Sequence, residues 1–292
     1  MRILLCTDGS PHAQAALRFG ASLARVSPEV STLLGVIEHQ ADREQVERAL
    51  EEGRAWLSVG LEPRIKIREG HAGEEIVDEA ASGEYDLLVV GTRGRRAITR
   101  FLLGTTAHRI ARHAAVPVLL VQGKRDAVKR ILVCTAGGEP GLAAVRVGGR
   151  VARLVGAQVT VLHVMSQLPA APVLPHAGML KVMPQTPAPS EPPSGALADL
   201  YASAEQLMRS GTREGVHLSE ALAILDGLDV PAEVRVRHGL VIDEILAEIH
   251  EGDHSLIVVG TRPIEGWMRF LLNDVSQQII GCTDRPILVV RA

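Results

Sequence analysis

Short β-rich runs alternate with segments of helical period along most of the chain. In the first 122 residues the runs occupy 3–7, 32–37, 64–68, 86–90 and 117–121. Between the first two runs, apolar residues recur at the i, i+3, i+4, i+7 spacing of an amphipathic helix: Ala13, Ala16, Leu17, Gly20, Leu23 and Ala24. Strands that alternate with helices indicate βαβ units and a parallel sheet.

Local signals support the helices of this pattern. Ser10-Pro11 offers a capping side chain followed by a proline at the first helical position. Acidic residues open another helical segment at 73–77, where the helix dipole favours them. The runs at 86–90 and 256–259 are continuously aliphatic, which is typical of strands buried on both faces. We therefore expect a doubly wound α/β fold, in which ligands lie beyond the carboxyl ends of the strands.

The chain contains this pattern twice. Residues 3–9 (ILLCTDG) return at 131–137 (ILVCTAG), and residues 86–93 (DLLVVGTR) return at 255–262 (SLIVVGTR). The two offsets, 128 and 169, differ by 41 residues, so the second copy carries an insertion between residues 164 and 234. The repeat predicts two tandem domains, at 1–124 and 129–292.

The insertion is rich in proline. Eight of the 16 prolines of the chain lie between residues 169 and 193. Proline removes backbone donors and favours extended conformations, so we predict a surface loop over 166–195, followed by a helix from about Ala196 to Glu214. The loop is either without a specific role or a lid or docking segment.

Composition excludes several classes of protein. The formal charge is −3 and only seven residues are aromatic, which argues against a nucleic-acid binder. No apolar stretch reaches the ~18–20 residues of a membrane span, and the first residues do not resemble a signal peptide. The three cysteines, Cys6, Cys134 and Cys282, form no CxxC pair and offer neither a disulfide framework nor a zinc site. We expect a cytoplasmic protein whose cysteines serve packing or redox sensing.

The segment after the fourth strand carries the candidate chemistry. Gly91-Thr92-Arg93-Gly94 is followed by nine residues and then by Gly104-Thr105. Glycines after a strand let the backbone turn tightly and approach a ligand. The helix that Gly104 opens has free N–H groups at its first turn, which suit a phosphate.

This G-x2-G-x9-G-[S/T] spacing resembles the ATP-binding motif of the universal stress protein family. The resemblance extends to Thr7-Asp8, to Val36-Ile37-Glu38 and to Val116-Pro117-Val118, and it covers nearly all of 1–122 and, more loosely, 129–292 apart from the insertion. It implies two tandem Rossmann-like domains, each with a five-stranded parallel sheet. The two domains would form an intramolecular pseudo-dimer in which the fifth strands pair, Val118–Val121 against Ile287–Val290.

The resemblance also implies a nucleotide site in the first copy. The end of the first strand would flank the nucleoside, with the Asp8 carboxylate accepting a hydrogen bond. The backbone of Val36 would read the adenine edge, and the two glycine segments would enclose phosphates that carry Mg²⁺ or Mn²⁺, without a dedicated metal cage. The implied site residues are Cys6, Thr7, Asp8, Val36, Gly91, Thr92, Arg93, Gly94, Arg95, Gly104, Thr105 and Thr106. Alternatively, Asp8 caps the first helix and the glycines serve packing alone.

The second copy departs from this motif. Ala136 replaces Asp8, Pro263 replaces Gly94, and Asn273-Asp274 replaces Gly104-Thr105. These changes remove a carboxylate, remove a backbone donor and place an anion near the phosphate position. We predict that the second copy does not bind ATP in the usual manner and instead covers the edge strand of the first.

Three functions remain open at this point. The leading prediction is a nucleotide-responsive regulatory or protective factor with one ATP in the first domain. A slow ATPase is the second, although the chain has no GxxxxGK[ST] loop, HEXXH motif or GxSxG elbow. The third is an adaptor that binds no nucleotide. We expect no nucleic-acid or membrane partner, and a homodimer is open.

Overall fold

The computed structural model describes residues 1–57, 61–92, 103–123, 127–166, 203–261 and 274–292. Its first half contains β1 (Ile3–Thr7), α1 (Pro11–Ala24), β2 (Thr32–Ile37), a 3₁₀ turn (Gln40–Asp42), α2 (Arg43–Leu57), β3 (Arg64–Glu69), α3 (Ala72–Ala80), β4 (Leu87–Gly91), α4 (Thr105–His113) and β5 (Val118–Val121). The five strands coincide with the five β-rich runs to within a residue at either end, which confirms the predicted alternation.

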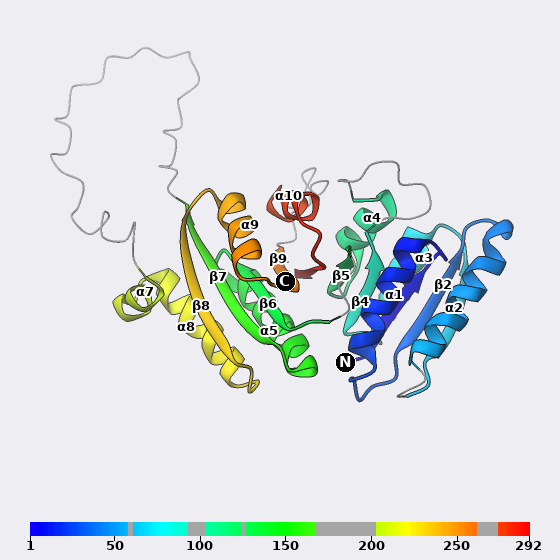
Figure 1. Ribbon diagram of the computed structural model, residues 1–292, viewed down its shortest axis with the longest axis horizontal. Coiled ribbons are helices and arrows are strands. Elements are labelled where there is room, and N and C mark those ends of the chain that lie inside the picture. The colour runs from blue at the N-terminus through cyan, green and yellow to red at the C-terminus, as the bar shows by residue number, and fades with distance from the viewer. Residues whose placement is uncertain (58–60, 93–102, 124–126, 167–202, 262–273) are drawn as a thin grey trace, which may run out of the picture.

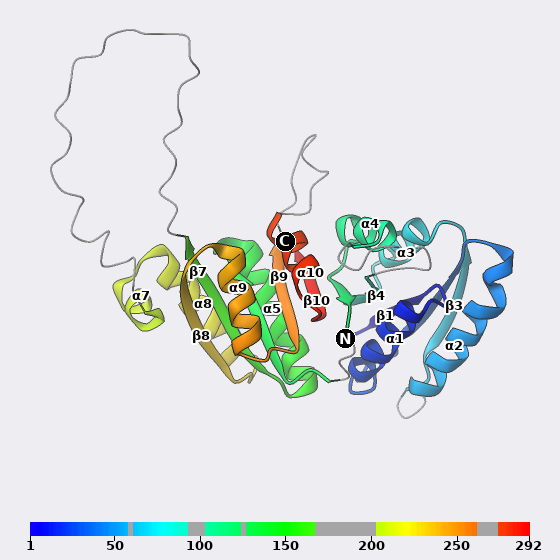
Figure 2. The same cartoon turned by 45° about the horizontal axis from the view of Figure 1, so that its top comes forward.

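The second half repeats this order with one addition. It contains β6 (Arg130–Thr135), α5 (Gly138–Val155), β7 (Gln158–Ser166), α7 (Ala204–Ser210), α8 (Arg213–Asp226), β8 (Ala232–Gly239), α9 (Val241–Glu251), β9 (Leu256–Thr261), α10 (Asp274–Cys282) and β10 (Ile287–Arg291). The added helix is α7, which follows the insertion. Figures 1 and 2 show the two halves side by side, with α7 at the outer end of the second.

The ten strands form one sheet in the order β3-β2-β1-β4-β5-β10-β9-β6-β7-β8. All pairings within each half are parallel. In the first half, α1 and α2 bury one face of the sheet, with Leu17 and Leu50 in the core, while α3 and α4 bury the other, with Ile76 and Ile110. Both cores continue into the second half, so the predicted doubly wound α/β fold with two tandem domains is confirmed.

The halves meet where the two fifth strands pair. β5 and β10 are antiparallel, with Leu119 opposite Leu288, the pairing that the sequence led us to expect. Beside it, the Gln122 side-chain amide donates hydrogen bonds to the carbonyls of Thr283 and Arg285, at 2.9 and 3.0 Å. Each strand covers an edge that the other half would otherwise expose.

The helix expected over 196–214 is two separate helices in the described part. Gly211 ends α7 in the left-handed conformation, with a φ of +65°. The next residue, Thr212, caps α8, its hydroxyl oxygen accepting the Gly215 N–H at 3.2 Å. This Gly-Thr pair stops one helix and starts another. Residues 167–202, which include nearly all of the predicted loop, lie outside the described residues.

None of the described helices has the length and apolar character needed to cross a membrane.

Candidate functional site

The loop between β1 and α1 is closed by its own side chains. The Thr7 hydroxyl oxygen accepts the Gly9 N–H at 3.0 Å, and the Asp8 carboxylate accepts the Ser10 N–H at 2.9 Å. Ser10 then caps α1 by accepting the Ala13 N–H at 3.2 Å. The capping residue of α1 is therefore Ser10, as the Ser-Pro pair predicted. Asp8 closes the turn before the cap and stays half-buried at the strand end.

A residue that sequence reasoning missed holds this loop from the side. Gln45 on α2 donates its amide to the Gly9 carbonyl at 2.7 Å. Gly9 has a φ of +74°, which favours glycine, and a Cβ there would lie 2.9 Å from the Gln45 side chain. Gln45 thus fixes the turn that carries Asp8. Little in the sequence indicates this contact of Gln45, because a glutamine on a charged helix is usually solvated.

The end of β4 lies against the start of α1. A Cβ on Gly91 would approach the His12 carbonyl oxygen to 2.8 Å, so glycine is required there for packing. The next residue, Thr92, is 3% exposed. Its N–H donates to the Val121 carbonyl at 3.2 Å, and its own carbonyl accepts the Gly104 N–H at 2.9 Å. These bonds bring the second glycine segment back to the end of β4.

Gly104 is the N-cap of α4 and provides no side chain to bond the first turn of that helix. Thr105 at the first helical position is exposed, and Thr106 is half-buried. The first N–H groups of an α-helix have no partner within the helix. This turn therefore offers donors and the positive end of a helix dipole at the carboxyl edge of the sheet, an arrangement suited to an anion.

The strand order places most of the predicted residues at one edge. β1 lies between β2 and β4, so Thr7 and Asp8 are next to the end of β4 and the start of α4. Cys6 and Val36 are also there, but both side chains are buried in the core, at 3% and 1% exposed. Only the backbone of Val36 could then contact a ligand. Arg93, Gly94 and Arg95 lie outside the described residues.

In the second half, two histidines lie against the end of β6, which corresponds to the end of β1 in the first half. Thr135, which corresponds to Thr7, lies 2.6 Å from His217 of α8, measured from its hydroxyl oxygen to Nε2. His163, which stands where the first half has Gly35, donates from Nδ1 to the Thr135 carbonyl at 3.0 Å. Both rings are buried. Burial and the neighbouring His163 lower the pKa of His217, which favours the neutral form of the His217 ring at the strand end.

Other changes predicted to disable the second copy are only partly described. Ala136 is exposed at the end of β6, so the carboxylate of the first half has no counterpart there. Pro263 and Asn273 lie outside the described residues. Asp274 is the first residue of α10.

Burial suppresses the reactivity of two cysteines. It raises the pKa of Cys6 well above its usual range and that of Cys134 to about 12, with nearby carboxylates acting in the same direction. Both are protonated thiols near neutrality, which favours packing over redox sensing. Cys282 is exposed. No group of three potential ligands that could hold a metal ion occurs among the described residues.

His108 of α4 faces the second half of the chain. It is half-buried at the junction between the halves, with Nε2 3.2 Å from the Gln277 amide nitrogen of α10. Burial, and then Arg112, lower the pKa of His108. His113, one turn later, is exposed.

A buried carboxylate that the sequence did not reveal fastens α3 to β3. Glu79 is 1% exposed. Lys66 and Arg68 of β3 each donate to it at 2.6 Å, as does the Tyr85 hydroxyl. Burial alone would raise the pKa of Glu79, but these hydrogen bonds outweigh burial and lower it to about 2. The carboxylate is ionised and satisfied, which makes this cluster a structural clamp.

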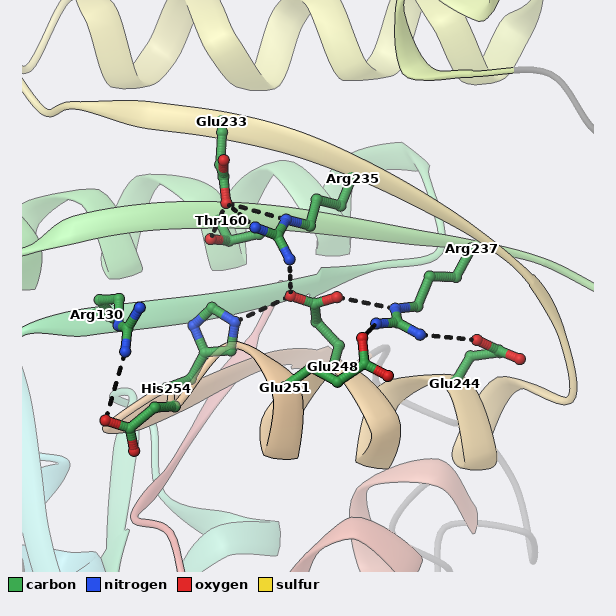
Figure 3. Close-up of polar contacts among 10 residues, drawn as sticks. Arg130, Thr160, Glu233, Arg235, Arg237, Glu244, Glu248, Glu251 and His254 are labelled. Carbon is green, nitrogen blue, oxygen red and sulfur yellow. Dashed lines mark hydrogen bonds and ion pairs between the residues drawn. The ribbon is translucent and has the colours of Figure 1, made fainter.

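The second half repeats the clamp with one substitution (Figure 3). Glu248 of α9 is fully buried and accepts from Arg235 and Arg237 of β8 at 2.9 and 2.8 Å. The fourth member is His254, whose Nε2 lies 3.2 Å from the Glu248 carboxylate where the first half has Tyr85. Both copies have a glutamate on the apolar stripe of a helix, and this is the sequence feature that could have indicated the clamps. Neither clamp lies at the carboxyl edge of the sheet.

Comparisons with known proteins agree with this geometry. The sequence model of the universal stress protein family matches residues 1–122 and 127–291. A universal stress protein of Mycolicibacterium smegmatis is 23% identical over 314 residues, covering 99% of this chain and 96% of that protein. One of Thermus aquaticus is 30% identical over 134 residues, covering 41% of this chain and 97% of the relative.

Among solved structures, a universal stress protein of Archaeoglobus fulgidus shares the fold with a TM-score of 0.69 at 19% identity, covering 99% of this chain and 98% of that one. A putative universal stress protein of Pseudomonas aeruginosa gives a TM-score of 0.62 at 14% identity, covering 99% and 92%. The family match spans nearly the whole chain, in two copies. The chain therefore belongs to the universal stress protein family, as a member with two domains in tandem.

Proposed function

We propose that this chain binds ATP in its first half and acts as a nucleotide-responsive regulatory or protective factor. The observation that carries the proposal is the uncapped first turn of α4, which Thr92 and Gly104 hold at the end of β4 beside the Asp8 loop. A triphosphate needs such backbone donors, and the nucleoside needs a neighbouring acceptor. In this proposal the Asp8 carboxylate accepts a hydrogen bond from the nucleoside.

The donor set fits ATP and its metal ion. The N–H groups of the first turn of α4, together with Arg93, Gly94 and Arg95, would hold the phosphates. The phosphates themselves would carry Mg²⁺ or Mn²⁺. The second half would not bind ATP, since the buried His163 and His217 rings stand against its strand end and Ala136 supplies no carboxylate.

Titration calorimetry with Mg-ATP tests the proposal. We expect a single site per chain, and we expect Asp8→Ala to weaken binding. Thr105→Pro is the sharper variant, because proline is tolerated at the first helical position but removes one phosphate donor. Its affinity should fall about tenfold, the worth of one charge-assisted hydrogen bond.

Asp274→Pro is the matched control, since it makes the same change at the first position of α10. It should leave ATP binding as it is in the unmodified protein. Absence of saturable ATP binding in the unmodified protein would refute the proposal and leave the nucleotide-independent adaptor. Equal loss in Thr105→Pro and Asp274→Pro would show that binding does not depend on α4.

A further inference from the structure

The outer edge of β8 is an open strand edge. β8 is the last strand of the sheet and pairs only with β7 among the described strands. In a parallel pair, alternate residues direct their main-chain groups toward the neighbouring strand. The Val159 N–H of β7 donates to the Pro231 carbonyl at 2.9 Å. By alternation Glu233, Arg235 and Arg237 direct their main-chain groups toward β7, and Val234 and Val236 direct theirs outward.

A groove of about 650 Å³ runs along this edge. Its lining comes from four consecutive residues of β8, from the first turn of α7 and from the buried glutamate of the clamp: Val234, Arg235, Val236, Arg237, Ser203, Ala204, Glu205 and Glu248. Both faces of the strand therefore contribute to the groove. Helix α7 lies next to α8 and β8 at the outer end of the sheet (Figures 1 and 2), so the added helix forms one of its walls.

The two sides of the groove differ in chemistry. Val234 and Val236 pack against the core that contains Leu207 of α7, so this side is apolar. The clamp forms the other side (Figure 3), where two guanidinium groups, Arg235 and Arg237, are paired with four carboxylates. The carboxylates are Glu233, Glu244, Glu248 and Glu251. With His254 neutral, this side carries two excess negative charges.

The corresponding edge of the first half lacks these features. On β3 the three cations Arg64, Lys66 and Arg68 are balanced by three carboxylates, so no charge is left over. The described residues of the first half include no counterpart of α7, and Ile65 and Ile67 are 39% and 43% exposed. In the part of the chain that the structure describes, the β8 edge therefore differs from the β3 edge in both its charge and its neighbouring helix.

We propose that the β8 groove binds an extended peptide segment of a partner protein in which apolar and basic residues alternate. The segment would add as a strand through the outward N–H and C=O groups of Val234 and Val236. Its apolar side chains would lie toward α7, and its basic side chains would lie toward the carboxylates of the clamp. This interaction goes beyond nucleotide binding and does not require it.

Fluorescence anisotropy with a labelled peptide tests this site in the full chain. The probe is an acetylated, amidated heptapeptide of alternating lysine and valine. We expect saturable binding, and binding at least about tenfold weaker when glutamate replaces every lysine. Val236→Pro removes one outward N–H and should weaken binding about tenfold. Val236→Thr keeps the N–H and should bind the peptide more tightly than Val236→Pro does. Ile67→Pro, at the other edge of the sheet, should bind as the unmodified protein does.

Two peptides give a readout that does not depend on how the variants fold. One carries N-methyl groups on all valines and the other on all lysines, so each blocks one edge of the extended chain. Strand addition predicts that one of them loses binding and the other keeps it. Equal effects of the two peptides, or equal binding by Val236→Pro and Val236→Thr, would overturn the proposal.

Other occupants of the groove would also be detected. A dimer in analytical ultracentrifugation that Val236→Pro converts to a monomer would assign the groove to a second copy of this chain. Peptide binding that appears only after deletion of residues 167–200 would assign it to that segment. Either result would overturn the proposal.

Discussion

Replacing His254 by tyrosine should remove an acid-sensitive element from the second half of the protein. His254 is 2% exposed, and its Nε2 faces the Glu248 carboxylate at 3.2 Å. Its Nδ1 is buried without a hydrogen-bond partner in the part of the chain that the structure describes. A proton added at Nδ1 would therefore be a buried charge with no acceptor of its own.

The direction in which stability changes with pH follows from the pKa of His254. Burial lowers it, Glu248 opposes the shift, and Arg130 and Arg235 reinforce it. The unfolded chain, whose histidine titrates near about 6.5, then binds this proton more readily than the folded chain does. His254 thus lowers the free energy of unfolding as the pH falls below about 6.5, and its effect levels off once the pH is below the folded pKa.

The size of this change in the free energy of unfolding is set by the uptake of a single proton. One proton taken up on unfolding corresponds to about 1.4 kcal/mol per pH unit. Between about pH 6.5 and 5.0 the loss from His254 is therefore at most about 2 kcal/mol. Tyrosine is the substitute for His254 because it occupies the equivalent position in the first half. There the Tyr85 hydroxyl donates to Glu79 at 2.6 Å and does not titrate in this range. Burial, and the hydrogen bond to Glu79, raise the pKa of Tyr85.

Urea unfolding of the unmodified protein and of His254→Tyr, followed across this pH range, measures the difference directly. The unmodified protein should lose up to about 2 kcal/mol more than the variant on acidification. His254→Gln is a second variant for the case that tyrosine does not fit the site, because glutamine keeps an amide donor but cannot titrate. Tyr85→His should add the same acid sensitivity to the first half. Parallel pH profiles for the unmodified protein and both His254 variants would refute the reasoning.

Three further outcomes are expected. Glu79→Gln leaves Lys66 and Arg68 facing a neutral amide and should lower the free energy of unfolding by about 2–3 kcal/mol in urea titrations, since both cations are partly exposed; no change would mean that the clamp is not structural. Gln122→Ala removes the amide that bridges the two halves and should cost about 1–2 kcal/mol in the same assay. A thiol reagent should modify only Cys282 in the folded protein, and all three cysteines should react after unfolding; fast modification of buried Cys6 would contradict its placement.

The repeated aliphatic runs predicted the strands well, because a strand buried on both faces leaves an unbroken apolar run such as 86–90. The pairing of β5 with β10 was implied by the resemblance to the universal stress protein family, and the repeat places both strands of that pair in one chain. The break at Gly211-Thr212 was missed, although the pair carries both a helix stop and a helix cap.

The histidines of the second half could not be paired from the sequence. His163 follows the first offset between the copies, but His217 lies beyond the insertion, where that offset no longer applies. Only the fold brings α8 back over the end of β6 and places His217 against Thr135. The clamps were missed for a related reason. A lone glutamate such as Glu79 is usually solvated, and its partners Lys66 and Arg68 come from a strand that contacts α3 only in three dimensions.

The two copies differ most where a ligand would bind and least where the sheet must be held together. The clamp recurs with the same geometry, with Arg235 and Arg237 standing for Lys66 and Arg68. It lies on an edge strand in both halves, where unpaired main-chain groups expose a sheet to unwanted pairing. At β3 the clamp leaves no net charge, whereas at β8 two added carboxylates, Glu233 and Glu251, leave an excess. Among the described helices only α7 lies beside an edge strand in this way, at β8, so the clamp becomes one side of a groove there. This is why we place the partner at β8 and not at β3.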